Sequence, residues 1–123
     1  MKNEKIILDE KSLWGLVENL NWSQDHDYKR IEGELKGLGL DVANQIHEFV
    51  SEKRGEICSQ YQEDWLGEPG IGVSDDGWSD LTNDIVGRGR KVFENINTKQ
   101  LQEIADSGDY YENFGYSFQF LYD

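Results

Sequence analysis

The residues whose types and spacing could support chemistry lie between positions 73 and 90, in the stretch VSDDGWSDLTNDIVGRGR. Adjacent carboxylates such as Asp75 and Asp76 can bind a cation or transfer protons. The two arginines that follow, Arg88 and Arg90, can bind carboxylates or phosphates. The stretch therefore raises three hypotheses: an ion site, a catalytic site, and a structural segment that fastens the chain.

The spacing within this stretch does not fit an ion-binding or phosphate-binding loop. When Gly77 is aligned with the invariant glycine of an EF-hand calcium loop, Asn83 occupies the position of the required glutamate. The sequence has no G-x-x-x-x-G-K-[ST] motif and no G-x-G-x-x-G motif after a predicted strand. Acids next to the glycines of GEPGIG at 67–72 would oppose a phosphate there. We predict no metal and no cofactor.

Histidine and cysteine give no catalytic pair. A metalloprotease helix needs a second histidine four residues after the first, and Ser51 stands in that position after His47. His47 and Cys58 share a predicted helix face, but they lie about 16 Å apart along its axis. Cys58 is the only cysteine, which excludes an intramolecular disulfide and a cysteine zinc cluster. We predict no catalytic residue and a protein that is not an enzyme.

Charge is the strongest signal in the composition, with 25 acidic against 12 basic residues and a formal net charge of −13. Such a chain is repelled by nucleic acid and anionic membranes, and it attracts basic proteins. The interval from Gly55 to Gly87 holds eight acids and no lysine or arginine. These acids and their aromatic neighbours predict a partner-binding surface, the alternative being a solvated face over buried rings. The predicted binding residues are Glu63, Asp64, Trp65, Glu68, Asp75, Asp76, Asp80 and Asp84.

A second set of residues is predicted to hold the fold together. Asp75 or Asp76 is expected to cap the following helix, or to pair with Arg54, Arg88 or Arg90 across the loop. Trp78 is expected to pack inward. Arg54 falls within the apolar stripe of its own helix, so its charge must reach the surface or meet a carboxylate.

Hydrophobic periodicity predicts a mainly α, single domain over residues 1–123, with about five helices. Helices are expected at 10–21, from 27 to the glycines at 37 and 39, at 41–62, from 79, and at 97–106. Asp9 or Ser12, Asp27 and Asn97 are the expected N-terminal caps. The predicted core stripe of the long helix is Ala43, Ile46, His47, Val50, Ile57, Cys58 and Tyr61.

The C-terminal stretch YYENFGYSFQFLY at 110–122 leaves two alternatives open. Its rings alternate with other residues, which predicts a short half-buried strand. An irregular or helical segment that packs its rings on the helices is the other interpretation. The chain has no secretory apolar segment and no run long enough to span a membrane. We expect a soluble, cytoplasmic protein that is monomeric when free.

The segment SDDGWSDLTNDIVGRGRKVFENI at 74–96 resembles the signature of a family of small, mostly bacterial domains of unknown function. That signature reads S-D-D-G-[FW], then an interval with apolar positions, then G-R and an apolar-aromatic pair followed by glutamate. LWGLVENL at 13–20 is similar to the tryptophan-bearing first helix of the family. NTKQL at 97–101 departs from the family's usual D-P-D-S-L. The resemblance implies a compact, mainly helical domain in which S-D-D-G is structural or recognitional.

In size and charge the chain also resembles the immunity proteins of contact-dependent growth inhibition and other polymorphic toxin systems. This resemblance implies a protein without catalysis that binds and neutralises one cognate basic toxin domain, often a nuclease. Two alternatives remain at this point. One is a small cytosolic enzyme or accessory subunit that uses Asp75 and Asp76 with Arg88 and Arg90, and the other is a generic acidic interaction module.

Overall fold

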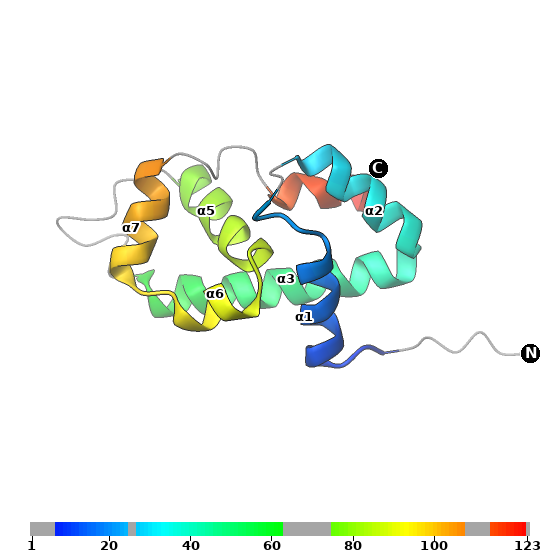
Figure 1. Cartoon of the computed structure of the whole chain (residues 1–123), viewed down its shortest axis with the longest axis horizontal. Helices are drawn as coiled ribbons and strands as arrows, with labels where there is room; N and C mark the ends of the chain where they lie inside the picture. The colour runs from blue at the N-terminus through cyan, green and yellow to red at the C-terminus, as the bar shows by residue number, and fades with distance from the viewer. Residues whose placement is uncertain (1–6, 25–26, 63–74, 108–113, 123) are drawn as a thin grey trace, which may run out of the picture.

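The computed structural model describes residues 7–24, 27–62, 75–107 and 114–122, and over these ranges the chain is all-helical (Figure 1). This confirms the predicted mainly α fold. The helices are α1 (Glu10–Asn19), α2 (Tyr28–Leu38), α3 (Leu40–Gln60), α5 (Asp75–Gly87), α6 (Arg90–Asn95), α7 (Thr98–Ser107) and the 3₁₀ helix η2 (Phe114–Tyr122).

Side-chain caps fix the starts of three helices where the sequence predicted them. An Asp9 carboxylate oxygen accepts the Ser12 N–H at 2.8 Å, which satisfies a free donor at the start of α1. Asp27 accepts the Lys29 N–H at 3.0 Å at the start of α2. Asn97 accepts the Gln100 N–H at 2.9 Å, which places the start of α7.

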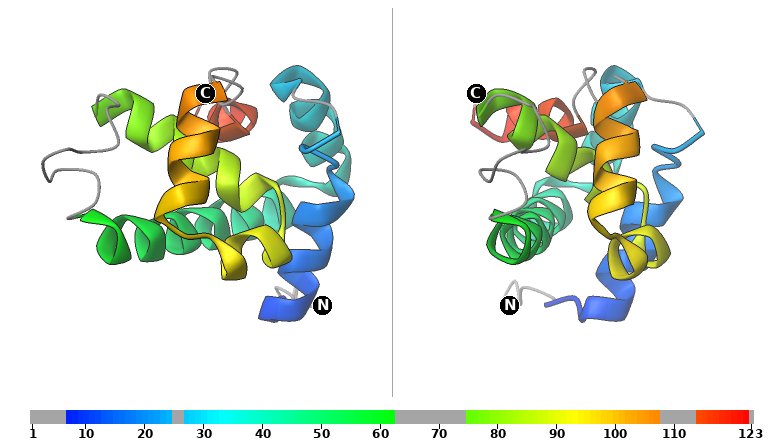
Figure 2. Two further views of the ribbon diagram at one scale, coloured as in Figure 1. Left: turned by 60° about the vertical axis from the view of Figure 1, so that its left-hand side comes forward. Right: turned by 90° about the vertical axis from the view of Figure 1, so that its left-hand side faces the viewer.

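Helix α3 organises the domain, because α1, α2, α5 and η2 all contact it. Figures 1 and 2 show α1 and α6 on the same side of α3. Gly39 alone separates α2 from α3. Its φ is 95°, a conformation that glycine adopts at little cost. Helix α5 begins at Asp75, four residues before the start expected from the sequence.

Aromatic side chains supply much of the core. Trp14 packs edge-on against Phe49 with ring centroids 5.0 Å apart. Trp22 is fully buried and lies 5.4 Å from Phe114. The predicted α3 stripe is confirmed at Ala43, Ile46, Val50 and Ile57, whereas His47, Cys58 and Tyr61 are half-buried at its margin.

The C-terminal segment is helical, so the strand alternative is wrong. The buried residues of η2 are Phe114, Ser117 and Phe118, whose spacing of three and four follows a helix and not a period of two. Tyr116 is exposed although its ring contacts Tyr28 edge-on at 5.6 Å. Alternation of rings in the sequence therefore did not correspond to alternation of burial.

Within η2, Ser117 is fully buried, and its hydroxyl has no hydrogen-bond partner among the residues that the structure describes. An unpaired buried hydroxyl destabilises the folded state. Ser117→Ala should therefore be neutral or raise the free energy of unfolding by up to about 1 kcal/mol in urea titrations. Ser79→Ala is the matched control, because the Ser79 hydroxyl accepts Arg54 Nη1–H at 2.8 Å and its loss should cost about 1–2 kcal/mol. A loss of stability in Ser117→Ala equal to that of Ser79→Ala would contradict this interpretation.

His47 joins α3 to the end of η2. Its Nε2 atom and the Tyr122 hydroxyl form a hydrogen bond, and its ring lies 5.1 Å from that of Phe118. Burial lowers the pKa of His47 below its usual 6.5, and the charge of Glu48 opposes this shift only in part. The folded state therefore resists protonation of this ring more than the unfolded state does.

This lowered pKa predicts a loss of stability on acidification. Below pH 6.5 the unfolded chain binds a proton at His47 that the folded chain does not yet bind, so the free energy of unfolding falls. We expect the melting temperature to fall more between about pH 7.5 and pH 5.5 in the wild type than in His47→Gln. Equal pH dependence in the two proteins would contradict a contribution from His47.

Candidate functional site

Asp84 was predicted to bind a partner at the surface, and this prediction is wrong. The Asp84 side chain is 0% exposed. It accepts the Trp22 Nε1–H at 2.7 Å and the Arg88 Nε–H at 2.6 Å. A buried carboxylate is tolerated because charged and polar donors satisfy it in this way. Asp84 is therefore a structural residue at the centre of the fold.

The two glycines of the GRGR segment are required for different structural reasons. A Cβ atom on Gly87 would lie 2.9 Å from Cγ of Phe114 and 3.0 Å from Cδ1 of Trp22, so the position admits no side chain without movement. Gly89 has a φ of 108°, which favours glycine. Close packing fixes the first glycine, and backbone conformation fixes the second.

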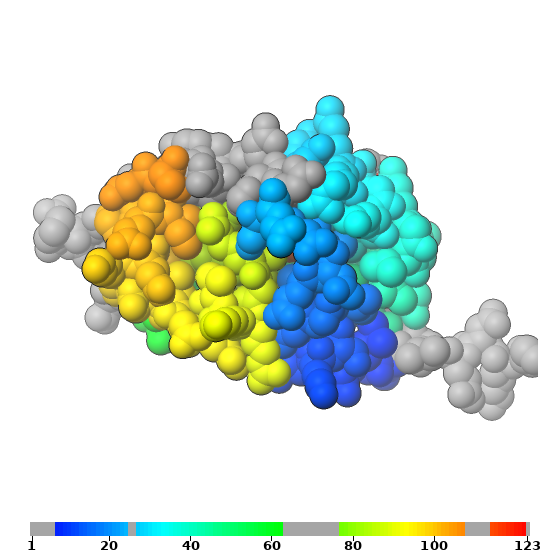
Figure 3. Space-filling model, viewed as in Figure 1, coloured from blue at the N-terminus to red at the C-terminus, as the bar shows by residue number. Residues whose placement is uncertain are grey.

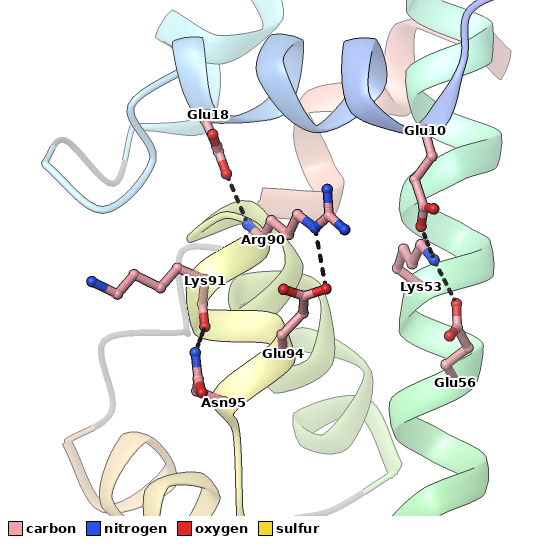
Figure 4. A network of polar contacts seen from close by, with 8 residues as sticks. All are labelled: Glu10, Glu18, Lys53, Glu56, Arg90, Lys91, Glu94 and Asn95. Atoms are coloured by element: carbon pink, nitrogen blue, oxygen red, sulfur yellow. Dashed lines mark hydrogen bonds and ion pairs between the residues drawn. The ribbon is translucent and has the colours of Figure 1, made fainter.

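The arginines of the same segment connect neighbouring elements. Arg88 is paired with Asp84, one helical turn earlier. The Arg90 backbone N–H donates to a Glu18 carboxylate oxygen at 3.0 Å, so α1 supplies the acceptor at the start of α6 (Figure 4). Arg90 Nε also donates to Glu94 at 3.1 Å. The observed partners are therefore Asp84 and Glu94, whereas the predicted partners, Asp75 and Asp76, have side chains outside the described part of the chain.

Two other residues predicted to be structural lie at the contact between α3 and α5. Trp78 is buried, as predicted. Arg54 is half-buried and donates from Nη1 to the Ser79 hydroxyl. The sequence predicted that Arg54 either pairs with a carboxylate or reaches the surface. In the structure a hydroxyl group accepts a hydrogen bond from the guanidinium group and so replaces part of its hydration.

Several predicted partner-binding residues lie outside the part of the chain that the structure describes. These are Glu63, Asp64, Trp65 and Glu68. Asp75 and Asp76 belong to the first turn of α5, but their side chains are also outside the described part. Asp80, on α5, is partly exposed.

Lys53, the buried cation of α3, was not predicted from the sequence (Figure 4). Its Nζ atom lies 2.6 Å from Glu10 and 3.1 Å from Glu56. The same atom lies 5.5 Å from the ring centroid of Phe49 and 5.7 Å from that of Phe93. Burial alone would lower the pKa of Lys53, but hydrogen bonds with Glu10 and Glu56 outweigh it, and the pKa is raised. Lys53 is therefore a cation held by two carboxylates and two aromatic rings.

Two hollows flank Lys53 along the side of α3 that meets α1 and α6, from Gln45 to Gln60, which we call the α3 edge. The first hollow, of about 170 Å³, is lined by Ile7, Leu8, Leu13, Gln45, Glu48, Phe49 and Glu52. The second hollow, of about 360 Å³, is lined by Glu56, Ile57, Gln60, Phe93, Glu94 and Ile96.

Contacts between helices hold the elements around these hollows in place. The Tyr61 hydroxyl donates to the Ile96 carbonyl at 2.8 Å, which fixes the end of α6 against the end of α3. The Glu10–Lys53 ion pair fixes the start of α1 against the middle of α3. Helices α1 and α6 abut on the surface of the molecule (Figure 3). The α3 edge is thus a defined surface in which each hollow combines a phenyl ring with two glutamates.

No three side chains of His, Cys, Asp or Glu come together as metal ligands would within residues 7–24, 27–62, 75–107 and 114–122. None of the helices in these ranges is long and apolar enough to cross a membrane.

Comparison with known proteins gave no relative from which a function could be carried over. The chain matches no protein-family model, no curated protein and no solved structure.

Proposed function

We propose that this protein is an immunity-type inhibitor that binds a basic toxin domain and neutralises it without catalysis. The observation that carries the proposal is the placement of charge. The chain has a surplus of thirteen acids over bases, and its arginines are engaged by its own side chains. The pairs are Arg30 with Glu34, Arg54 with Ser79, Arg88 with Asp84, and Arg90 with Glu94.

Because these arginines are bound by side chains of the same chain, acidic groups predominate among the charges that remain for a partner. Lys36 and Lys53 are likewise paired with glutamates on the same or neighbouring helices. Acidic residues such as Glu48, Glu52 and Glu103 are exposed. An acidic field of this kind raises the association rate with a cationic partner and disfavours other partners.

A toxin nuclease must present cationic groups to the phosphates of its substrate. The carboxylates of an inhibitor are negatively charged hydrogen-bond acceptors, as the phosphates are. They can therefore occupy the surface of the toxin that binds its substrate. The alternative of an enzyme that uses Arg88 and Arg90 is less well supported, because Arg88 is bound to buried Asp84 and Arg90 to Glu94.

The test is affinity capture with the intact protein, at about 50 mM and about 300 mM salt, followed by identification of the bound proteins. We expect to capture a basic protein domain at low salt, and we expect its binding to be weaker at high salt because exposed charges are screened. Addition of the purified protein should then inhibit the toxic activity of that domain in stoichiometric amounts. Capture of only acidic or neutral proteins, or a captured partner whose activity is unaffected, would overturn the proposal.

A further inference from the structure

We propose that the exposed side of η2 is a contact surface for a second copy of this chain, and that two molecules associate there about a two-fold axis beside Gln119. We call this surface the tyrosine face, and its residues are Tyr116, Gln119 and Tyr122 of η2 with Tyr28, Lys29 and Glu32 of α2. The inference is independent of the proposed function, and the dimer differs from the monomer expected from the sequence.

The 3₁₀ conformation of η2 aligns its three exposed residues. Tyr116, Gln119 and Tyr122 are exposed, whereas the residues between them are buried or half-buried. A 3₁₀ helix has about three residues per turn, so side chains three positions apart lie directly above one another. In an α-helix Tyr122 would instead be turned by about 120° from Tyr116. The exposed residues therefore form a straight stripe about 12 Å long.

The stripe reads the same from either end, because a tyrosine stands three positions before and three positions after Gln119. A contact between identical chains about a two-fold axis must be self-complementary in this way. When two stripes meet antiparallel, each Tyr116 lies opposite Tyr122 of the second copy, and the two Gln119 side chains meet at the axis. A glutamine amide both donates and accepts hydrogen bonds, so two of them can pair.

Neighbouring side chains hold both tyrosine rings in position before association. Tyr28 contacts Tyr116 edge-on with ring centroids 5.6 Å apart, and His47 is hydrogen-bonded to the Tyr122 hydroxyl. Both rings nevertheless stay accessible, since Tyr116 is 49% and Tyr122 is 69% exposed. Side chains that are already held lose less conformational freedom when they are buried in an interface, and this favours association.

A hollow beside Tyr116 gives the ring of the second copy a place to pack. The hollow lies between α2 and η2, has a volume of about 420 Å³, and is lined by Tyr28, Lys29, Glu32, Tyr116 and Gln119. In the antiparallel arrangement, Tyr122 of the second copy lies over this hollow. The two-fold axis repeats the contact, so apolar area is buried at both ends of the stripe.

The distribution of charge favours a second copy over a basic partner at this face. Two molecules with a formal net charge of −13 repel each other. Helices α2 and η2 together contain three bases and two acids, so the surplus of acids lies on the rest of the chain. Association through the tyrosine face therefore joins the parts of the two molecules that carry no negative surplus. A basic partner would gain no attraction from these parts.

Sedimentation equilibrium from about 5 to about 500 μM protein tests for the dimer. The tyrosine face has far fewer than the roughly 20–30 residues that each side of a stable interface contributes, so we expect a dissociation constant on the order of 10 μM at about 300 mM salt. Added salt screens the repulsion between the copies. The dimer should therefore be about fivefold tighter at 300 mM than at 50 mM salt, the opposite of the effect on a basic toxin. A protein that stays monomeric, or a dimer that salt weakens, would overturn the inference.

Dilution of isotope-labelled protein locates the contact without any substitution. The amide shifts that change with concentration should centre on residues 28–32 and 116–122. Shifts centred on another part of the molecule would mean that the dimer forms through a different surface and that the inference is wrong. A protein that is monomeric alone but whose tyrosine face is covered by a captured partner would also overturn it, because the surface would then serve another protein.

Opposite charges at position 119 test the two-fold axis. Gln119→Glu and Gln119→Lys each bring two like charges together at the axis, so each variant alone should dimerise at least about tenfold more weakly. An equal mixture of the two variants brings opposite charges together and should associate at least as tightly as the wild type. Because Gln119 is exposed, both variants should keep the wild-type melting temperature.

Gln100→Glu is the matched control for charge. Gln100 is exposed on α7, which lies at the opposite end of the molecule from α2 (Figure 1). The substitution adds the same charge as Gln119→Glu and should weaken the dimer by less than about twofold. Equal weakening by the two variants, or a mixture that associates no more tightly than its components, would overturn the inference. Either result leaves the proposed function standing, because capture of a basic domain tests that proposal separately.

Discussion

Asp84→Ala should lower the free energy of unfolding by about 3–5 kcal/mol, the cost typical of removing one partner of a buried ion pair. The substitution deprives the Trp22 indole N–H and the Arg88 guanidinium of an acceptor that is fully buried. A domain of this size has a total stability on the order of 5–15 kcal/mol, so the variant should be largely unfolded on mild heating. Urea titration followed by circular dichroism measures the change.

Two controls isolate the cause of this loss. Asp106→Ala, at an exposed position of α7, should change the stability by less than about 0.5 kcal/mol. Asp84→Leu combined with Arg88→Met removes both charges and should be less destabilised than Asp84→Ala alone. If Asp84→Ala and Asp106→Ala melt at the same temperature, the assignment of Asp84 as the central structural acid is wrong.

Gly87→Ala should destabilise the protein by about 1–3 kcal/mol, the usual cost of overpacking a core. The added methyl group would lie 2.9–3.0 Å from ring carbons of Phe114 and Trp22, and both rings are fully buried, so neither can move aside freely. The expected consequence is a displacement of η2 from the end of α5. A lower urea midpoint and a change in near-ultraviolet circular dichroism would report it.

Gly33→Ala is the matched control, because nothing lies within 4 Å of the Cβ atom that it adds to α2. Alanine is favoured over glycine inside a helix, so this variant should gain about 0.5–1 kcal/mol. The two identical chemical changes should therefore have opposite signs. A gain in stability for Gly87→Ala would contradict the close approach of the two rings.

The parts of the fold that were predictable depend on neighbours in the sequence. Asp9, Asp27 and Asn97 cap helices by accepting N–H groups two or three residues further on, so local residue types suffice to identify them. The apolar stripe of α3 repeats at helical spacing for the same reason. These features require no knowledge of how the helices pack.

The parts that were missed depend on partners distant in the sequence. Asp84 lies 62 positions from Trp22, and nothing near Asp84 signals that an indole will bury it. Lys53 is buried although lysine rarely is, because Glu10 comes from another helix to pair with it. The candidate site has the same origin, since its hollows form only where α1 and α6 meet α3.

The most direct test of the central claim, that the folded domain recognises a basic protein through its carboxylates, is the affinity for a captured partner as a function of salt. We expect both the association rate and the affinity to fall as salt rises from about 50 to about 300 mM, because the steering charges are screened. A partner without excess positive charge, or an affinity independent of salt, would show that the domain does not recognise its partner through its carboxylates.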